Sequence, residues 1–257
     1  MADDFIIITD GNHLDYQSPD GQGYGLIPRD FTSEPFGTYA AFSAPLLSWA
    51  EIKERAEYRK ATKTRNCDRL AAKGFVDSNQ SRTNYCWMHG CVNGLHGTRI
   101  ANNQPLVKLS AASAAAPANS FRNAGGWGTQ ALKWLQEHGV ATMDLWPANE
   151  ISRSLWTPEA KASAMRSRVE EWEDMESRDY RALCSALVQD LLCPVAFNWW
   201  KHLICALDPE FDDASDTSPN LICLNSHGQG KHILLTGRRA IADDAQVIRR
   251  VSIYGAN

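Results

Sequence analysis

A glutamine and a cysteine six positions apart are the first residues whose types and spacing suggest chemistry. Gln80 precedes the pair Cys86 and Trp87, and an apolar helical pattern begins at the cysteine. The unpaired N–H groups at a helix N-terminus lower the pKa of a thiol and so favour the nucleophilic thiolate. The Gln80 amide and the Cys86 N–H would supply two donors for a developing oxyanion. Packing is the competing interpretation, because free cysteine is among the most buried residue types.

Further segments accompany this stretch in a consistent order. They are "KGFVDSNQSRTNYCW", an "LS" pair after the helix, "NAGGW", and "ALKWLQEHGVATMDLWP". Together they resemble the papain-like cysteine peptidases over about residues 65–257, and the chain also resembles trimmed members encoded by bacteriophages. The resemblance implies that Gly125, Gly126 and Trp127 border the substrate cleft, with Gly126 binding the substrate backbone.

Two histidines compete for the role of the base. His202 in "WWKHLICALD" and His232 in "GKHILLTGRR" both precede apolar runs. A cysteine peptidase also needs a later residue that orients the imidazole. Asn225, in "NSHG", resembles the asparagine of the family's Asn-Ser-Trp-Gly motif, and it lies 139 residues after Cys86, within the range of about 130–150 for such sequences. Choosing His232 would leave Ser252 in that place, so the resemblance favours Cys86, His202 and Asn225, with Gln80 as oxyanion donor.

Three departures from the family pattern carry expectations. His227 replaces the aromatic residue that shields the Asn–His hydrogen bond, so we expect a wetter pair, a weaker hold on the tautomer and reduced activity. Lys201 precedes the proposed base, where a cation opposes imidazolium formation. Thr83 replaces a cysteine three residues before the nucleophile, and no cysteine follows "RNAGG". These cysteine losses suit a reducing compartment.

The organisation along the chain predicts an α+β fold. Residues 1–64 are predicted to be an N-terminal arm or pro-like extension, and residues 65–257 a papain-like domain. Within that domain, residues 65–192 are predicted to form a mainly helical lobe and residues 193–257 a mainly antiparallel β lobe. The resemblance implies that the two lobes enclose a groove between them.

Local patterns predict the individual elements. Strands are predicted at "FIIIT", "PVAFNWWKHLICALD", "NLICLNS", "KHILLTG" and "VSIYG". A helix capped by Ser48 and Glu51 closes the arm. The remaining helices are predicted at 86–100, at 129–139, from the N-cap Thr157, and in "RDYRALCSALVQDLL". We interpret "LSAASAAAPANS" as a low-complexity link and the charged run "EEWEDMESRD" as a solvated helix face.

Composition limits the classes of function. The 257 residues carry a formal charge of −4 with dispersed Lys and Arg, which argues against nucleic-acid binding. No apolar run approaches the ~20 residues of a membrane span, and the acidic start does not resemble a signal peptide. We therefore expect no membrane partner and a cytoplasmic or virion-associated location. Seven cysteines, an odd number without a CxxC pair, predict reduced thiols.

A metal site is the weakest of the chemical alternatives. Cys86, His89, Cys91 and His96 crowd into eleven residues, but their spacing matches no paired-ligand motif, and helix phase turns Cys91 away from the others. The glycine-rich stretches "GQGYG" and "GQGKH" are not phosphate loops. The sequence thus predicts no metal and no cofactor.

Two functions of different classes follow from these observations. The first is a thiol peptidase that acts on a peptide or protein substrate, with Cys86 as nucleophile, His202 as base and then acid, Asn225 as orienting residue and Gln80 as oxyanion donor. The second is a structural or interaction protein that retains the papain-like fold, as a virion component whose residues 1–64 dock it to other virion proteins.

Overall fold

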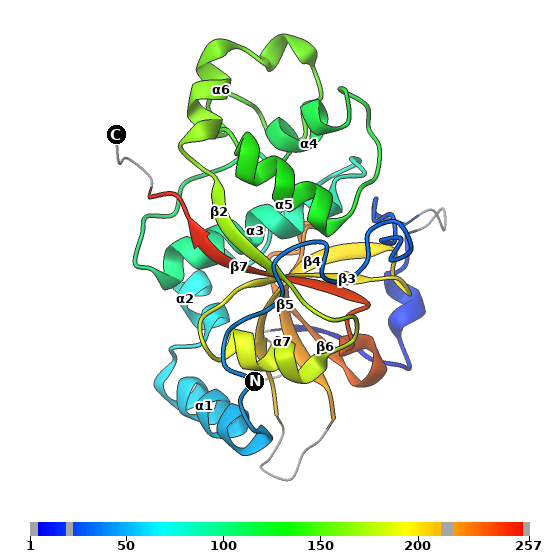
Figure 1. Ribbon diagram of the computed structural model, residues 1–257, viewed down its shortest axis with the longest axis vertical. Helices are drawn as coiled ribbons and strands as arrows, with labels where there is room; N and C mark the ends of the chain where they lie inside the picture. The colour runs from blue at the N-terminus through cyan, green and yellow to red at the C-terminus, as the bar shows by residue number, and fades with distance from the viewer. Residues whose placement is uncertain (1–4, 19–22, 212–217, 254–257) are drawn as a thin grey trace.

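A seven-stranded mixed sheet forms the centre of the protein. The computed structural model describes residues 5–18, 23–211 and 218–253. The strand order is β1-β6-β5-β4-β3-β7-β2 (Figure 1). Only β1 and β6 pair in parallel, in the register Phe5 to His232, and the other neighbours are antiparallel. The strands are β1 (Phe5–Ile8), β2 (Val169–Asp174), β3 (Cys193–Phe197), β4 (His202–Pro209), β5 (Asn220–Leu224), β6 (His232–Thr236) and β7 (Asp244–Val251).

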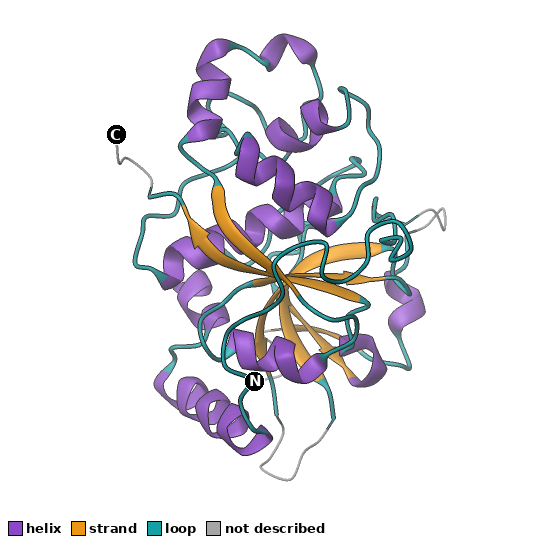
Figure 2. Cartoon of the chain, in the orientation of Figure 1, coloured by secondary structure: helices purple, strands orange, loops and turns teal. Residues whose placement is uncertain are grey.

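The helices lie in two groups along the long axis of the molecule. α4, α5 and α6 gather at one end, while α1 and α7 lie at the other (Figures 1 and 2). The helices are α1 (Trp49–Thr62), α2 (Asn66–Ala72), α3 (Cys86–Ala101), α4 (Ala112–Ala118), α5 (Gly128–Glu137), α6 (Pro158–Met165) and α7 (Tyr180–Leu187). Short 3-10 turns lie at His13–Tyr16, Arg153–Leu155 and Gly237–Ala240. The α+β prediction is confirmed, with a mainly helical part preceding most of the sheet.

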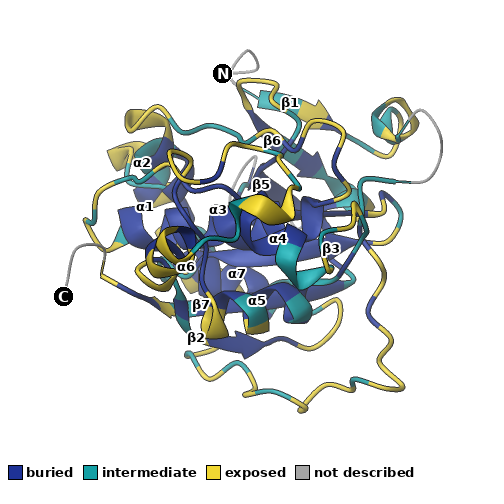
Figure 3. Cartoon of the chain, turned by 90° about the horizontal axis from the view of Figure 1, so that it is seen from above, coloured by how far each residue is buried: buried dark blue, intermediate teal, exposed yellow. Residues whose placement is uncertain are grey.

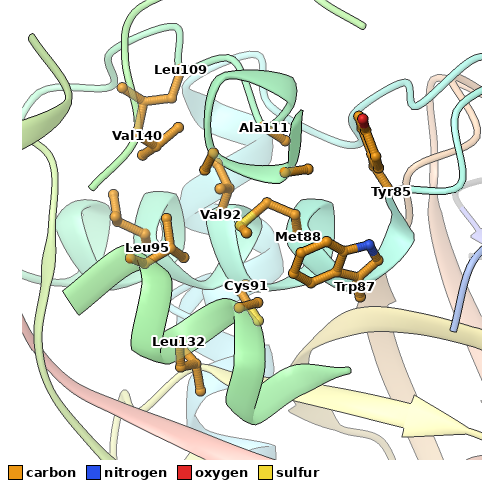
Figure 4. Packing of buried hydrophobic residues seen from close by; sticks show 14 of the residues in the cluster. Tyr85, Trp87, Met88, Cys91, Val92, Leu95, Leu109, Ala111, Leu132 and Val140 are labelled. Carbon is orange, nitrogen blue, oxygen red and sulfur yellow. The ribbon is translucent and has the colours of Figure 1, made fainter. Parts of the chain in front are cut away.

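Helix α3 is the buried centre of the helical part. It lies against β4, β3 and β7 (Figure 3), and its outer face packs Val92 and Leu95 near Leu132 and Val140 (Figure 4). Gly90 permits close contact with the sheet, because a Cβ there would lie 2.3 Å from Leu203 Cδ2. The predicted helix at 86–100 is confirmed, and its first residue is Cys86.

The strand predicted at "VSIYG" is wrong beyond its first residue, because β7 ends at Val251. Ser252 and Ile253 are not in a strand, and residues 254–255 lie outside the described residues.

Two further predictions of local structure are wrong. The charged run expected on a solvated helix contains β2, in which Glu173 and Asp174 are buried. Their carboxylates are satisfied from the N-terminal region, since Ser43 N–H donates to Glu173 and Arg29 pairs with Asp174. The expected link contains α4, whose alanines are small enough to be buried against the core. Both errors arise because long-range contacts override local composition.

The N-terminal region contributes to the core. β1 extends the sheet at β6, as the apolar "FIIIT" run predicts, and Ile8 is fully buried. The capping box of Ser48 and Glu51 is confirmed at the start of α1. α1 then packs Ile52 into a cluster with Val188, which follows α7. The division of the chain at residue 64 stays a prediction.

Candidate active site

Cys86 lies at the first turn of α3 and is fully buried. The backbone N–H groups of Leu203, Trp87 and Leu26 lower its pKa, but burial outweighs them and raises the pKa of the thiol to about 12. Two of these N–H groups come from other parts of the chain, β4 and the N-terminal region. The side chain of Cys86 therefore lies at the meeting point of α3, β4 and residues near Leu26, where it is a neutral thiol.

His202 begins β4, and Asn225 follows the end of the adjacent strand β5. The two side chains are joined by a 2.8 Å hydrogen bond between His202 Nε2 and Asn225 Oδ1. Asn225 Oδ1 also accepts from Ser226 N–H at 2.8 Å, which assigns it as the amide oxygen. His202 Nε2 therefore carries the proton, and Nδ1 keeps a free lone pair. That nitrogen is buried and has no hydrogen-bond partner within the described part of the chain, so no hydrogen bond joins it to the Cys86 thiol in this conformation.

His227 shields the His202–Asn225 hydrogen bond from water. Its ring stacks on His202 with centroids 4.6 Å apart and planes 20° from parallel. His202 is fully buried, and Asn225 is only 2% exposed. The expectation of a wetter pair is thus wrong for this conformation, because an imidazole covers the bond as an indole would. Burial lowers the pKa of His202 well below its ordinary value. The neighbours that lower this pKa further are His227 and His89, rather than the exposed Lys201.

Gln80 and the backbone of Cys86 converge on one carbonyl oxygen. Ser226 Oγ donates to Gln80 Oε1 at 2.7 Å and so fixes the orientation of the amide. Gln80 Nε2 donates to the carbonyl of Tyr24 at 2.9 Å, and Cys86 N–H donates to the same oxygen at 3.4 Å. Two donors aimed at one carbonyl beside a thiol are the arrangement that stabilises a tetrahedral oxyanion.

The carbonyl in this position belongs to the chain itself. Residues 23–27, here called the covering segment, run between α3 and the start of β4. Tyr24 and Leu26 both donate backbone N–H groups to Lys201 O, at 3.1 and 3.4 Å. The Tyr24 ring lies 4.8 Å from the His202 ring and 4.2 Å from the His227 ring, between centroids. The covering segment thereby separates the cysteine and histidine from solvent.

The residues expected to bind substrate contact the N-terminal region in this conformation. Gly126 N–H donates to Gly25 O at 3.0 Å, and Ile27 N–H donates to Gly126 O at 2.9 Å. Trp127 Nε1 donates to the Glu34 carboxylate at 3.1 Å. Gly125 is closely approached too, since a Cβ there would lie 2.5 Å from Gly25 O. A peptide could use these backbone groups only after residues 23–27 leave.

Gly25 allows the covering segment to take this path. Its φ is +107°, a conformation that L side chains rarely adopt, and a Cβ there would lie 2.1 Å from Asn84 O. Any side chain at this position would destabilise the observed conformation of the segment, because the positive φ would be strained and the added carbon would clash with Asn84 O.

A buried ion network holds the next part of the N-terminal region. Arg29 donates to both carboxylate oxygens of Asp174, at 2.7 and 2.8 Å, and to Asp244 at 3.3 Å. Its side chain has no exposed area. Glu34 lies near the same guanidinium and also accepts from Thr129 Oγ1 at 2.6 Å. Charges at this depth need their partners, so Arg29 anchors the region to β2 and β7.

The alternative base lies elsewhere in the structure. His232 begins β6. Burial lowers its pKa to about 4, and Asp68, Arg65 and Phe75 also influence this pKa. Ser252 Oγ donates to Arg166 O and accepts from Arg168 N–H. The imidazole that lies against Asn225 is that of His202, and not that of His232.

The described residues contain no group of three or more His, Cys, Asp or Glu side chains that could hold a metal ion. All seven cysteines are free and buried. No helix in the described ranges combines the length and apolar character that a membrane span requires.

Solved structures establish the class of fold. Xylellain, a cysteine protease from Xylella fastidiosa, is similar over 88% of this chain and 96% of its own, with TM-score 0.61 and 14% identity. Digestive procathepsin L 3 of Tenebrio molitor (66% of this chain and 65% of its own; TM-score 0.56; 15% identity) and bromelain from Ananas comosus in complex with the E64 inhibitor (69% and 93%; 0.55; 15%) are also similar.

The fold is therefore that of the papain-like cysteine proteases, as the sequence motifs predicted. The chain spans just under two thirds of the length of that procathepsin. Neither the protein-family models nor the curated protein sequences gave a match to this chain.

Sequence reasoning missed three contributors to this site. Tyr24 fills the position of a bound carbonyl, Arg29 anchors the region that carries it, and Ser226 orients Gln80. The signal available for the first was the pair of glycines on either side of Tyr24 in "GYG", both with positive φ. The other two depend on contacts between distant segments, which no local pattern reports.

Proposed function

We propose that this protein is a thiol peptidase that hydrolyses peptide bonds in a peptide or protein substrate. The observation that carries the proposal is the convergence of Gln80 Nε2 and Cys86 N–H on a single carbonyl oxygen beside the thiol. The His202–Asn225 bond adds an oriented base. The papain-like fold supplies the scaffold on which such sites occur.

Each of these groups has a defined role in the proposed reaction. His202 Nδ1 takes the proton of Cys86, and the thiolate attacks the substrate carbonyl carbon to form an S–C bond. Gln80 and the Cys86 N–H stabilise the oxyanion. His202 then protonates the departing amine as the C–N bond breaks. Water, deprotonated by His202, then attacks the acyl carbon; the S–C bond breaks to release the acid product, and His202 returns the proton to the sulfur. Asn225 holds the tautomer throughout.

We also propose that the conformation described here is latent. Burial keeps Cys86 as a neutral thiol with a pKa of about 12 and lowers the pKa of His202. The thiolate that attack requires is thus disfavoured while the covering segment is in place. Its departure would hydrate both groups and free the oxyanion donors. Within residues 1–64, the covering segment is then the part that acts as a pro-segment would.

Turnover of an unstructured protein substrate tests the peptidase proposal. Cys86→Ser should abolish cleavage in the Gly25→Ala background, in which the covering segment is destabilised. Cys91→Ser, at another buried cysteine of α3, is the matched control and should keep most of the rate, with folding checked by circular dichroism. Cleavage by the Cys86→Ser variant at the rate of its parent would refute the assignment.

A structural role is the second candidate, and the buried Arg29 network favours it. Because Arg29 pairs with Asp174 and Asp244 inside the protein, complete removal of the N-terminal region would leave two buried carboxylates without their partner. A region held in this way stays part of the protein's own fold, as a structural protein would require, while docking of residues 1–64 to virion proteins stays a prediction. A scaffold would tolerate Cys86→Ala without functional loss, whereas a peptidase would not. The cytoplasmic or virion-associated location is part of either proposal.

A further inference from the structure

A cavity lies beside α3, and the proposed peptidase chemistry does not use it. Its volume is about 480 Å³, within the range of small-molecule sites. One face of α3 contributes His89, Val92 and His96 to the wall. The rest comes from the loops before and after the helix and from Met143 to Asn149, with Met143 40% exposed at the surface.

Most of the wall is apolar, with side chains that include Phe75, Val92, Leu106 and Leu109. The Phe75 ring meets the edge of the His96 ring with centroids 4.7 Å apart. Such a wall favours an apolar body, and an aromatic ring can pack edge-to-face with Phe75.

One ring nitrogen on this wall, His96 Nδ1, is a buried atom with no hydrogen-bond partner in the described ranges. His96 itself is only 4% exposed. His89 differs, because the Asn149 side chain acts on its ring as a hydrogen-bond acceptor and raises its pKa, which opposes the effect of burial. Buried polar groups in proteins almost always have partners, so the His96 nitrogen at an apolar cavity points to a ligand.

The contact of the His96 ring shows that this nitrogen is an acceptor. His96 Nε2 lies 3.0 Å from Val107 O and must donate to it, which leaves Nδ1 with a lone pair.

Burial keeps the His96 ring neutral near pH 7. It lowers the pKa of His96 to about 3, with Arg99 contributing. A ligand that satisfies His96 Nδ1 must therefore donate a hydrogen, and a carboxylate, which only accepts, does not fit this nitrogen.

We infer that this cavity binds a neutral aromatic molecule that carries a hydroxyl group, of the phenol class. Its ring lies against Phe75, Leu106 and Leu109, and its hydroxyl donates to His96 Nδ1. The binding site is separate from Cys86, so the inference does not depend on peptidase activity.

Calorimetric titration of the full chain with three matched probes tests the inference. 4-Ethylphenol should bind saturably. Ethylbenzene, which lacks the donor, and 4-ethylbenzoate, which is charged, should each bind at least ~10-fold more weakly, because a buried acceptor then stays unsatisfied. Ethylbenzene or 4-ethylbenzoate binding as tightly as the phenol, or no saturable binding of the phenol, would overturn the inference.

Variants at Ala148 test the location. Ala148 lines the cavity and is exposed, so substitution there should not disturb folding. Ala148→Trp should fill the cavity and weaken 4-ethylphenol binding at least ~10-fold, while Ala148→Ser should leave it within ~2-fold. Equal affinity in the Ala148→Trp variant would contradict this site. Binding should also persist in Cys86→Ser, whether or not that variant shows the peptidase proposal to be right.

Discussion

Two parts of the N-terminal region meet the rest of the molecule in different ways. The covering segment, residues 23–27, contacts the cleft through backbone hydrogen bonds to Lys201 and Gly126 and buries Leu26 in the core, while Ile27 remains 47% exposed. Helix α1 instead buries Ile52 completely in an apolar cluster and also carries the buried Arg59. The first part is attached mainly by backbone hydrogen bonds with one buried apolar side chain, whereas the second is a helix attached by apolar burial and a buried arginine.

The difference shows which part can move. Backbone hydrogen bonds exchanged for water contribute only about 1 kcal/mol each, and exposing Leu26 adds about 1.5–3 kcal/mol to the cost of releasing the covering segment. Releasing α1 would expose Ile52 at a similar cost and would also separate the buried Arg59 from Asp190. A segment that blocks a site reversibly must be of the first kind. Arg29 lies between the two parts and limits how far the movement extends.

The largest expected effect concerns the two histidines that begin strands. In the Gly25→Ala background, His202→Ala should lower kcat/KM by at least ~10³-fold, because it removes the base that contacts Asn225. His232→Gln should cost less than ~1 kcal/mol, about 5-fold, since His232 lies at β6. Comparable losses in both variants, or a larger one for His232→Gln, would contradict the proposed triad.

Breaking the anchor should have the next largest effect. Arg29→Met leaves Asp174 and Asp244 buried without their cation, and we expect a loss of about 3–5 kcal/mol in the free energy of unfolding. Burial already raises the pKa of Asp244 to about 6, above its ordinary value. Its stabilising contribution is therefore present at low pH and lost as the pH rises through 6.

Urea denaturation at two pH values measures this effect of Arg29→Met. The destabilisation should be larger at pH 8 than at pH 5, because the unpaired carboxylate can be protonated at the lower pH. Arg239→Met is the matched control, since Arg239 pairs with Asp10 at the surface, where ion pairs contribute little. Equal, small losses for both variants would show that the N-terminal region is not anchored by Arg29.

A smaller effect is expected from pH alone. Burial lowers the pKa values of His89 and His227 to about 4 and that of His96 to about 3, so stability should fall as the pH decreases below 6.5. Asp208 and Asp244, with pKa values raised to about 6, oppose this trend. The histidines outnumber them, and we expect a net loss on the order of 2 kcal/mol from pH 7 to pH 5. Denaturation showing a gain of stability over that interval would mean that the acids dominate.

The sequence predicted the residues of the candidate site better than their surroundings. The spacing of Gln80 and Cys86 and the "NSHG" motif are short-range signals, and the structure puts Asn225 against His202 as they suggested. The strand at 169–174 was missed because its buried acids depend on Arg29 and Ser43, which are more than a hundred residues away. The covering segment was missed for the same reason. The roles of the site residues stay predictions until activity is measured.

Alkylation of Cys86 by a thiol-directed peptide epoxide, followed by mass spectrometry, tests the central claim most directly. Gly25→Ala strains the covering segment by about 1–3 kcal/mol in its present position and should accelerate labelling at Cys86 at least ~10-fold over wild type. Gly37→Ala is the control, since Gly37 also has positive φ but has nothing within 4 Å of the added carbon. Its labelling rate should equal that of wild type. Absence of Cys86 labelling in all three proteins, or equal rates in all three, would contradict a reactive thiol held latent by residues 23–27.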